Sequence, residues 1–478
     1  MNDLTARKSS TSDASNTVPD EVFRNYDIRG FADAQITPNF AHKLGIVLAI
    51  MLRQQQHSSI YLGRDGRLSS PKLAQSLGEG LVQQGLNVID IGAVSTPVLN
   101  YAVHCDNQAD CGIMVTASHN AKHYNGFKII VRDQVIAGEM LQTIKQRMLS
   151  DIPSNSSLGD ISCSDVAPDY LNAIIDNCKP TKKFKLVIDC GNSIVGPLAI
   201  KLFEQLGYEL ITLFCQPDGN FPNHDPNPSD QNNLVALQAE VLSHKADLGL
   251  AFDGDGDRLV AVAGNGKIVW PDQLLMIFAR DILHRHPNTD IVFDVKSSFR
   301  LQQLVSELSG NPVMCKTGHS HIRSAVQRTG ALVGGEYSGH IFFNDRWHGF
   351  DDGLYASIRL LEILANCDMA PKPALEKMVD HFKPSAYTPE ILIPVTESQK
   401  FALMAQLITH CTFRDAIINT IDGLRVEYPL GWGLIRASNT SANLTMRFEA
   451  DNDVELERIK KRFNHELKPF INHVDQYL

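Results

Sequence analysis

The stretch Asp253-Gly-Asp-Gly-Asp-Arg258 has the residue types and the spacing of a metal site. Its three aspartates alternate with glycines, which allow a tight turn, and converging carboxylates repel one another unless a cation neutralises them. An EF-hand is disfavoured, because a strand-like run precedes the stretch and because Arg258 and Gly264 stand where that loop needs Gly and Glu. A solvated acidic turn is the plain alternative. Two glycines directly after a buried strand favour a catalytic Mg²⁺ site with Asp253, Asp255 and Asp257 as ligands.

A second loop, Thr116-Ala-Ser-His-Asn120, also follows an apolar run. Its serine does not lie in the G-x-S-x-G pattern of a hydrolase nucleophile, so acyl transfer is disfavoured. If Ser118 faced the predicted Mg²⁺ site, it could carry a phosphoryl group whose oxygen would complete the ligand set. His119 is expected to orient this loop.

Two further loops hold groups that suit sugars and phosphates. Gly335-Glu-Tyr-Ser-Gly-His340 places a carboxylate, a hydroxyl and an imidazole between glycines, a set that can bind vicinal sugar hydroxyls. Arg436-Ala-Ser-Asn-Thr440, with Arg447 beyond it, offers the groups of a phosphate-binding loop. Ser, Asn and Thr are equally common in helix caps and turns, so each loop is weak evidence when taken alone.

The elements around these loops repeat three times. Short apolar runs alternate with helical patterns, which predicts parallel sheets with helices on their faces. Ile60–Asp65, Lys185–Asp189 and Asp290–Asp294 each begin such a unit, and a later apolar run in each unit leads into one of the first three loops. Ligands collect beyond the carboxyl ends of parallel strands, so we expect the three loops to face one shared cleft.

After His381 the pattern changes, since HFKPSAYTPE carries two prolines and is typical of a linker. The sequence therefore predicts an α/β protein with three similar mixed α/β domains plus a smaller C-terminal α+β domain, arranged around a central cleft. We expect a flexible tail at residues 1–18. We name the four loops the serine loop (Thr116–Asn120), the acidic loop (Asp253–Arg258), the sugar loop (Gly335–His340) and the phosphate loop (Arg436–Thr440). The expected domains cover residues 19–164 with the serine loop, 165–267 with the acidic loop, 268–381 with the sugar loop and 382–478 with the phosphate loop.

Length and composition exclude several classes of protein. The chain has 478 residues and a formal net charge of −10, so it suits several domains and offers no general basic surface for nucleic acid or an anionic membrane. The cysteines form no C-x-x-C pair, which disfavours a zinc knuckle or a disulfide scaffold. No run approaches the ~20 apolar residues of a membrane span, and no signal-peptide pattern opens the chain. We expect a cytoplasmic protein.

Taken together, the four loops resemble those of the α-D-phosphohexomutase superfamily, and most closely its bacterial phosphomannomutase/phosphoglucomutase branch. The similarity covers nearly the whole chain after the tail, and the four motifs occur in the family's order. It implies a phosphoserine at Ser118, which would join the three aspartates as a metal ligand. It also places Arg258 beside the phosphoserine and makes Lys128 and His340 the candidate proton-transfer residues.

The resemblance further implies a set of substrate-binding positions. Glu336 and Ser338 would hold sugar hydroxyls, and the RASNT loop would bind the distal phosphate. Two departures from the family pattern stand out, because Ala121 and Ala442 replace prolines that family members often have, which removes backbone stiffness but no chemical group. The implied substrate-binding residues are Tyr26, Arg29, Lys296, His319, Glu336, Ser338, Arg436, Ser438, Asn439 and Thr440.

The implied reaction is the reversible conversion of hexose 1-phosphate and hexose 6-phosphate, for mannose and glucose, through a phosphoserine enzyme and a hexose 1,6-bisphosphate. Mg²⁺ would be the cofactor and glucose 1,6-bisphosphate the activator. We expect a monomer whose partners are hexose phosphates, with no nucleic acid and no membrane. Tyr337 disfavours the glucosamine-specific branch, which tends to carry Gln at this position.

Other functions stay open from the residues alone. One is a phosphoglucosamine mutase, which would differ only in its sugar. A metal-dependent phosphatase would use the same metal and the same phosphoserine. A non-catalytic sugar-phosphate binding protein would not need Ser118, the three aspartates and Arg258 together.

Overall fold

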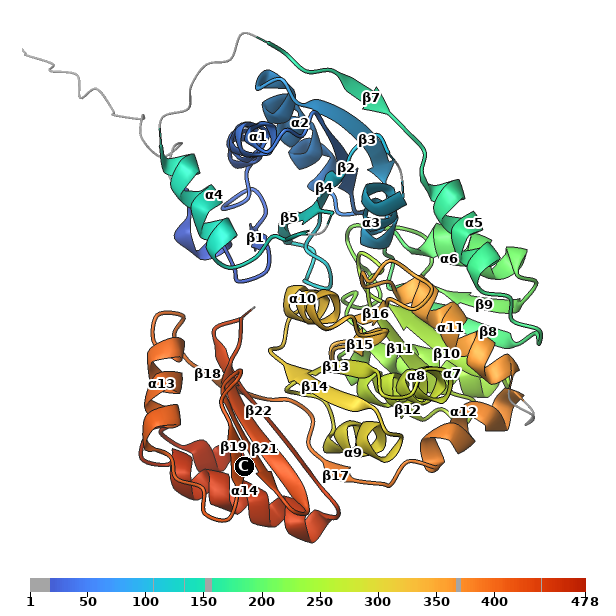
Figure 1. Ribbon diagram of the computed structural model, residues 1–478, viewed down its shortest axis with the longest axis vertical. Coiled ribbons are helices and arrows are strands. Elements are labelled where there is room, and N and C mark those ends of the chain that lie inside the picture. Colours follow the sequence, from blue (N-terminus) through green and yellow to red (C-terminus); the bar gives the residue numbers. More distant parts are fainter. Residues whose placement is uncertain (1–17, 106, 133, 151–156, 367–370, 440) are drawn as a thin grey trace, which may run out of the picture.

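The computed structural model describes residues 18–105, 107–132, 134–150, 157–366, 371–439 and 441–478, and Figure 1 shows that they form four α/β units. Each unit is built on one sheet, and we number these domains 1 to 4 in chain order. The expected tail lies outside the described residues except for Val18. Within the described ranges, none of the helices combines the length and the apolar character that crossing a membrane requires.

Domain 1 holds a sheet in the order β1-β5-β4-β2-β3-β7, with β6 beside β5. Its strands are β1 Ile28–Phe31, β2 Ser59–Arg64, β3 Asn87–Ala93, β4 Cys111–Val115, β5 Tyr124–Val131, β6 Gln134–Val135 and β7 Ile161–Cys163. Its helices are α1 Pro38–Gln54, α2 Ser70–Gln83, α3 Thr96–Cys105 and α4 Glu139–Leu149.

Domain 2 has the sheet order β12-β11-β10-β8-β9, and domain 3 has the order β14-β13-β15-β16. The elements of domain 2 are α5 Ala167–Asn177, β8 Lys185–Asp189, α6 Gly196–Gln205, β9 Glu209–Leu213, α7 Val235–Ser243, β10 Leu248–Phe252, β11 Leu259–Ala263 and β12 Ile268–Val269. Those of domain 3 are α8 Pro271–Arg285, β13 Asp290–Asp294, α9 Phe299–Glu307, β14 Asn311–Cys315, α10 His319–Thr329, β15 Val333–Gly335, β16 Ile341–Phe343, α11 Gly353–Ala365 and α12 Pro371–Asp380.

Domain 4 pairs its described strands in antiparallel fashion, in the order β17-β22-β21-β20-β19 with β18 beside β22. Its elements are β17 Ala386–Tyr387, β18 Ile391–Pro394, α13 Lys400–His410, β19 Ile417–Asn419, β20 Leu424–Tyr428, β21 Gly431–Ala437, β22 Asn443–Ala450 and α14 Asp453–Leu467. Short 3₁₀ turns lie at Asp20–Val22, Gln231–Leu234 and Val474–Gln476.

Domains 1 to 3 share one strand pattern, which confirms the predicted repetition. The shared orders are β5-β4-β2-β3, β11-β10-β8-β9 and β16-β15-β13-β14. The strand that leads into each chemical loop lies parallel to the first strand of its unit and antiparallel to the strand that follows. The sheets are thus mixed rather than wholly parallel, because each loop returns the chain directly as a hairpin. The three loops lie at these hairpin turns.

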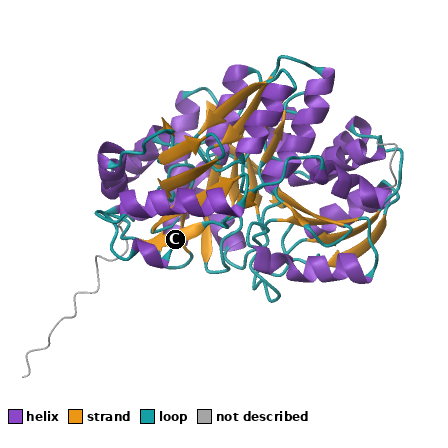
Figure 2. Ribbon diagram, turned by 90° about the horizontal axis from the view of Figure 1, so that it is seen from below, coloured by secondary structure: helices purple, strands orange, loops and turns teal. Residues whose placement is uncertain are grey.

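Local sequence explains where these elements begin. The strands β4 and β10 are buried along their whole length, as expected for continuous apolar runs covered on both faces. Helix α1 begins after Thr37, whose side chain accepts a hydrogen bond from the Phe40 N–H, and Pro38 stands in its first turn, where no amide hydrogen is needed. Figure 2 shows helices packed against the sheets.

The hydrophobic clusters show how the domains are joined. One continuous cluster runs from Tyr61 in domain 1 through domain 2 to Phe382 at the end of domain 3, and domain 1 has a further large cluster of its own. Domain 4 has a cluster of its own, and Trp432 and Leu434 on its sheet meet Val295 and Phe299 of domain 3 in a small separate cluster. Domain 4 is therefore joined to domain 3 by a limited apolar contact.

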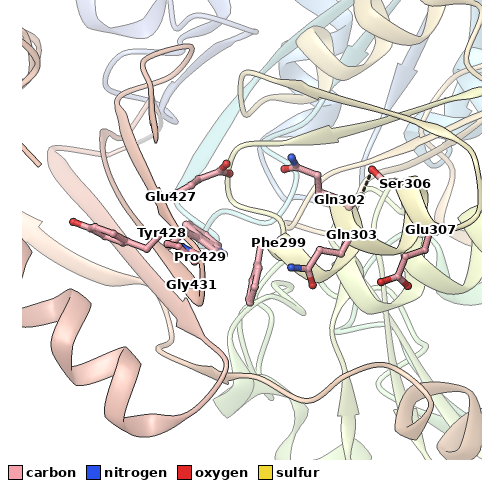
Figure 3. A pocket seen from close by; sticks show the side chains of 10 residues that line it. Phe299, Gln302, Gln303, Ser306, Glu307, Glu427, Tyr428, Pro429 and Gly431 are labelled. Carbon is pink, nitrogen blue, oxygen red and sulfur yellow. Dashed lines mark hydrogen bonds between the residues drawn. The ribbon is translucent and has the colours of Figure 1, made fainter. Parts of the chain in front are cut away.

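A groove runs along this junction between α9 and the hairpin of β20 and β21 (Figure 3). Its cavity has a volume of about 390 Å³. Phe299, Gln302 and Gln303 line it from domain 3, and Glu427, Tyr428 and Trp432 line it from domain 4. None of the site residues expected from the sequence is among the residues that line this groove, so the candidate site lies elsewhere.

Candidate active site

A cleft of about 610 Å³ collects residues from all four domains. Most of the residues expected to bind substrate line it, together with Arg258, His340 and His119. Thr440 lies outside the described residues. The expected substrate-binding residues in the lining are Tyr26, Arg29, Lys296, His319, Glu336, Ser338, Arg436, Ser438 and Asn439.

Ser118 lies just beneath this lining, at the turn between β4 and β5. Its backbone is left-handed, with φ 50°, and its side chain is almost fully buried. The Ser118 Oγ donates a hydrogen bond to the Asp253 Oδ2 at 2.8 Å and lies 3.1 Å from the His119 Nδ1. A Cβ on Gly254 would come within 2.2 Å of the Ser118 carbonyl oxygen, so only glycine lets the serine loop and the acidic loop pack this closely.

The three aspartates of the acidic loop converge as the sequence predicted, with one oxygen of each within 4.8 Å of the others. The Asp253 Oδ1 accepts hydrogen bonds from the backbone N–H groups of Gly256 and Asp257, at 3.0 and 3.1 Å. Burial and the two neighbouring carboxylates raise the pKa of Asp253 to about 8. Among the described residues, the buried Oδ1 atoms of Asp255 and Asp257 accept no hydrogen bond, although the Asp257 Oδ1 lies 3.4 Å from the His340 Nδ1 as an ion pair. The Asp255 Oδ1 is thus available to a cation.

Lys128 projects from β5 into this acidic cluster. Its Nζ lies 2.7 Å from the Asp255 Oδ2 and 2.5 Å from the Asp257 Oδ2. Burial disfavours the ammonium form, but the surrounding carboxylates outweigh burial and raise the pKa of Lys128. Lys128 is therefore a charged ammonium here, which cannot accept a proton in this state.

His340 lies between the acidic loop and a carboxylate that the sequence analysis missed. The Arg258 Nε donates to the His340 Nε2 at 3.0 Å, and the His340 Nδ1 lies 2.8 Å from the Asp351 Oδ2. Burial opposes protonation of His340, but Asp257 and Asp351 outweigh it and raise the pKa. Asp351 occurs in the sequence GFDDG, which reads as a helix start and gives no sign of this contact.

Arg67 is a second residue that sequence reasoning missed. It is buried, and its guanidinium donates to the carbonyl oxygens of Ser118, Asn120 and Ala121 at 2.7, 2.6 and 2.8 Å. Its Nε donates to the Asp65 Oδ2 at 3.0 Å. One side chain thus holds the backbone of the serine loop, including the alanine that stands in place of a proline.

The sugar loop offers unpaired groups to the cleft. Glu336 is buried, and within the described ranges neither its Oε2 nor the Ser338 Oγ has a hydrogen-bond partner. The backbone of Ser338 is held by domain 2, because its carbonyl oxygen accepts a hydrogen bond from the Ser229 Oγ at 2.9 Å. These two groups are free to bind sugar hydroxyls.

Two cations stand further along the cleft, each beside a carboxylate. The Lys296 Nζ lies 3.2 Å from the Glu390 Oε1, and the Arg436 Nε donates to the Asp422 Oδ2 at 2.9 Å. In the described structure the Arg436 Nη2 has no partner. Ser438 follows on the same loop, where its hydroxyl accepts a hydrogen bond from the Ser441 Oγ at 2.9 Å. This end of the cleft therefore offers cations to an anionic ligand, although the net charge of the chain is negative.

Domain 1 reaches across the cleft to domains 3 and 4. The Tyr26 hydroxyl donates to the Thr317 carbonyl oxygen at 2.6 Å and accepts from the Asn439 Nδ2. The Arg29 Nη1 donates to the Asn120 Oδ1 at 2.9 Å, which ties Arg29 to the serine loop. The His319 ring meets the Tyr26 ring edge-on, and burial lowers the pKa of His319 to about 4. The expected residues thus surround one space.

Arg447 does not face this space. Its guanidinium lies 3.7 Å from the centre of the Tyr337 ring, and its Nη2 donates to the Asp272 Oδ2 at 3.3 Å. It is buried between domains 3 and 4. The sequence suggested that Arg447 contributes to the phosphate loop. Its contacts instead give it a role at the junction of domains 3 and 4.

Comparison with known families accounts for most of the chain. Residues 20–153, 168–266 and 270–383 match phosphoglucomutase/phosphomannomutase alpha/beta/alpha domains I, II and III, and residues 390–466 match the C-terminal domain of the same family.

Individual relatives agree with these matches. A phosphomannomutase/phosphoglucomutase of Pseudomonas aeruginosa is 46% identical over 95% of this chain and 96% of its own. A phosphoglucomutase of Neisseria gonorrhoeae is 43% identical over 93% of this chain and 96% of its own. The crystal structure of a phosphoglucomutase/phosphomannomutase family protein from Burkholderia thailandensis superposes with a TM-score of 0.89 at 40% identity, covering 96% of this chain and 99% of that one. The chain belongs to the phosphoglucomutase/phosphomannomutase family.

Proposed function

We propose that this chain is a phosphomannomutase/phosphoglucomutase, which interconverts the 1-phosphates and 6-phosphates of mannose and glucose. The observation that carries the proposal is Ser118, whose hydroxyl lies 2.8 Å from Asp253 beneath a cleft that ends in Arg436. A phosphorylated Ser118 donates its phosphoryl group to the free hydroxyl of a hexose monophosphate. The hexose 1,6-bisphosphate so formed turns end for end and returns its other phosphoryl group to the serine.

The acidic loop fits Mg²⁺, because three buried carboxylates converge and two of their oxygens accept no hydrogen bond. Asp253, Asp255, Asp257 and Ser118 would hold the ion, which when bound offsets charge on the phosphoryl oxygens. Arg258, whose Nε lies 3.7 Å from the Asp253 Oδ2, stands beside the serine and stabilises negative charge there.

His340 and Lys128 are the proposed proton-transfer residues. His340 lines the cleft, and its Nε2 accepts a hydrogen bond from Arg258, so a small shift of that guanidinium would free the nitrogen for a substrate hydroxyl. Asp351 holds the opposite ring nitrogen and fixes the orientation of the imidazole. Lys128, as an ammonium, is the proposed donor of the pair.

The remaining residues would bind the sugar and its distal phosphate. Glu336 and Ser338 hold hydroxyls that glucose and mannose share, so the configuration at the 2-position of the sugar contributes little to recognition. Tyr26, Arg29, Lys296 and His319 complete the walls. The proposed phosphate-binding residues are Arg436, Ser438, Asn439 and Thr440. Glucose 1,6-bisphosphate is the proposed activator, since it would phosphorylate Ser118 when the serine is free.

The relatives also support a second candidate. A probable phosphoglucosamine mutase of Methanosarcina acetivorans is 32% identical over 91% of this chain. The higher identity to the Pseudomonas and Neisseria relatives favours mannose and glucose phosphates. A metal-dependent phosphatase and a non-catalytic sugar-phosphate binding protein remain testable alternatives.

The expected domain boundaries, near residues 164, 267 and 381, are proposals that the four matched family segments support. A cytoplasmic location and a monomeric state stay predictions from the sequence.

The test is to incubate the protein with Mg²⁺, trace glucose 1,6-bisphosphate and, separately, mannose, glucose or glucosamine 1-phosphate, and to measure the 6-phosphate formed. We expect conversion of the mannose and glucose substrates. Ser118→Ala should reduce it by roughly a thousandfold or more, because the phosphoryl carrier is lost. Ser243→Ala, at an exposed position of α7, is the matched control.

Each contrary result selects an alternative. Conversion of glucosamine 1-phosphate alone would favour the phosphoglucosamine mutase. Net release of inorganic phosphate would favour the phosphatase, and no conversion of any sugar would favour the binding protein.

A further inference from the structure

Glu390 places a carboxylate among the cations that would receive the distal phosphate. It lies at the end of the linker between domains 3 and 4, directly before β18, and lines the same cleft as Lys296, Arg436 and Ser438. Its Oε1 is 3.2 Å from the Lys296 Nζ. About a third of its side chain is exposed, so a ligand in the cleft can reach it.

The charge of Glu390 is set by its neighbours. Burial alone would raise its pKa, but the positive charges of Lys296, Arg436 and Arg447 outweigh burial and hold the pKa below the usual value. The carboxylate is therefore ionised at neutral pH. An anion that binds Lys296 and Arg436 must compete with it.

We propose that Glu390 is a positioning residue that acts as a built-in competitor for the distal phosphate site. Its carboxylate pairs with Lys296 when phosphate leaves and is displaced from Lys296 when phosphate binds. This inference rests on the proposed function, in which the hexose 1,6-bisphosphate has to release its distal phosphate in order to turn. Without the Glu390 carboxylate, the cations would hold the bisphosphate more tightly and slow its turning.

A purely structural reading makes the opposite prediction. If the Lys296–Glu390 pair only fastened the linker to domain 3, removal of the carboxylate would loosen the cleft and weaken phosphate binding. If Glu390 competes with phosphate, the same change should strengthen binding. The sign of the change in affinity therefore separates the two.

The experiment measures the Kd of inorganic phosphate by titration calorimetry in the wild-type protein and in Glu390→Gln. We expect phosphate to bind roughly three- to tenfold more tightly in the variant, with a smaller gain at high salt because the competing charge is screened. Glu457→Gln removes the same charge from an exposed position on α14 and should leave the Kd unchanged. Glu390→Asp keeps the charge and should behave more like the wild type than Glu390→Gln does.

Turnover gives a second readout. Glu390→Gln should lower both KM and kcat for glucose 1-phosphate, since the substrate binds more tightly and the intermediate is released more slowly. The tightening of phosphate binding should disappear in the Glu390→Gln/Lys296→Gln double variant, measured against Lys296→Gln alone.

Some results would overturn the inference. An unchanged or weaker phosphate affinity in Glu390→Gln would do so, and so would a tightening that persists in the double variant. Because the calorimetric titration needs no turnover, it remains decisive even if the wild-type protein converts none of the hexose phosphates, which would refute the proposed function separately.

Discussion

Tyr337 is the point at which the sugar loop meets domain 4. The Arg447 guanidinium lies 3.7 Å from the centre of its ring, the Lys296 Nζ lies 5.7 Å from it, and the Trp270 ring stacks beside it. The aromatic ring therefore orders two cations at once, one at the domain junction and one in the cleft. The sequence suggested a role for Tyr337 in substrate choice, and the contacts add a role in holding domain 4.

This arrangement separates two substitutions of Tyr337. Tyr337→Phe keeps the ring face and should retain most of the activity, whereas Tyr337→Ala removes it and should lower kcat/KM for mannose 1-phosphate by roughly tenfold, because cation–π contacts contribute about 1–2 kcal/mol. Steady-state assays of both variants make the comparison. Equal losses in the two variants would show that the hydroxyl, and not the ring, matters.

At the scale of elements, the positions of the chemical loops could be predicted from the sequence, but the residues that hold these loops in place could not. Buried apolar runs such as Leu248–Phe252 indicate strands, and the polar residues that follow must lie at a strand end. Arg67 gives no such signal, because its partners are carbonyl oxygens more than 50 residues away along the chain. For the same reason no residue that stiffens the loop at Ala121 could be identified from the sequence. In the structure, Arg67 holds the backbone of this loop.

Arg67→Gln should therefore damage both stability and catalysis. Loss of the guanidinium leaves several buried carbonyl groups and the Asp65 carboxylate without their partner, which should lower the free energy of unfolding by about 3 kcal/mol. Denaturant unfolding measures this effect, and the mutase assay should show a lower kcat.

Ala121→Pro offers a way to separate the two effects of Arg67. A proline at this position would stiffen the serine loop, so it should restore part of kcat in the Arg67→Gln background. It should leave the stability loss largely in place, because the Asp65 carboxylate would still lack its partner. Recovery of neither quantity would show that Arg67 does not act through loop rigidity.

At the scale of the whole molecule, the apolar cluster that joins domains 1 to 3 contrasts with the polar junction of domain 4. That junction includes buried hydrogen bonds from Arg425 to the Val295 carbonyl oxygen at 2.5 Å and from Ser298 to the Glu449 carboxylate at 2.7 Å. Apolar periodicity in the sequence predicts which face of an element is buried, but not which domain covers it. The shared cleft could be predicted because three loops follow equivalent strands. The junctions depend on hydrogen-bonded residue pairs that lie far apart in the chain.

His104 is a test of how domains 1 and 3 are joined. It lies in the last turn of α3, its Nδ1 lies 2.7 Å from the Asn100 carbonyl oxygen, and its Nε2 lies 3.0 Å from the Arg323 Nη2 on α10 of domain 3. Burial, with the Arg323 charge, lowers the pKa of His104 to about 4. The folded protein therefore keeps this imidazole neutral at pH values where the unfolded chain, with an ordinary pKa near 6.5, binds a proton.

The sign of the pH dependence follows from that difference. Because the unfolded state binds more protons between pH 6.5 and 4, the contribution of His104 to stability is fully present above pH 6.5 and is lost progressively as the pH falls to about 4. The total loss should be about 3 kcal/mol. Denaturant unfolding of the wild type and of His104→Gln at pH 7.5, 6, 5 and 4.5 measures it, and the variant should show a shallower decline. Parallel declines in the two proteins would mean that His104 is not held neutral at the junction of domains 1 and 3.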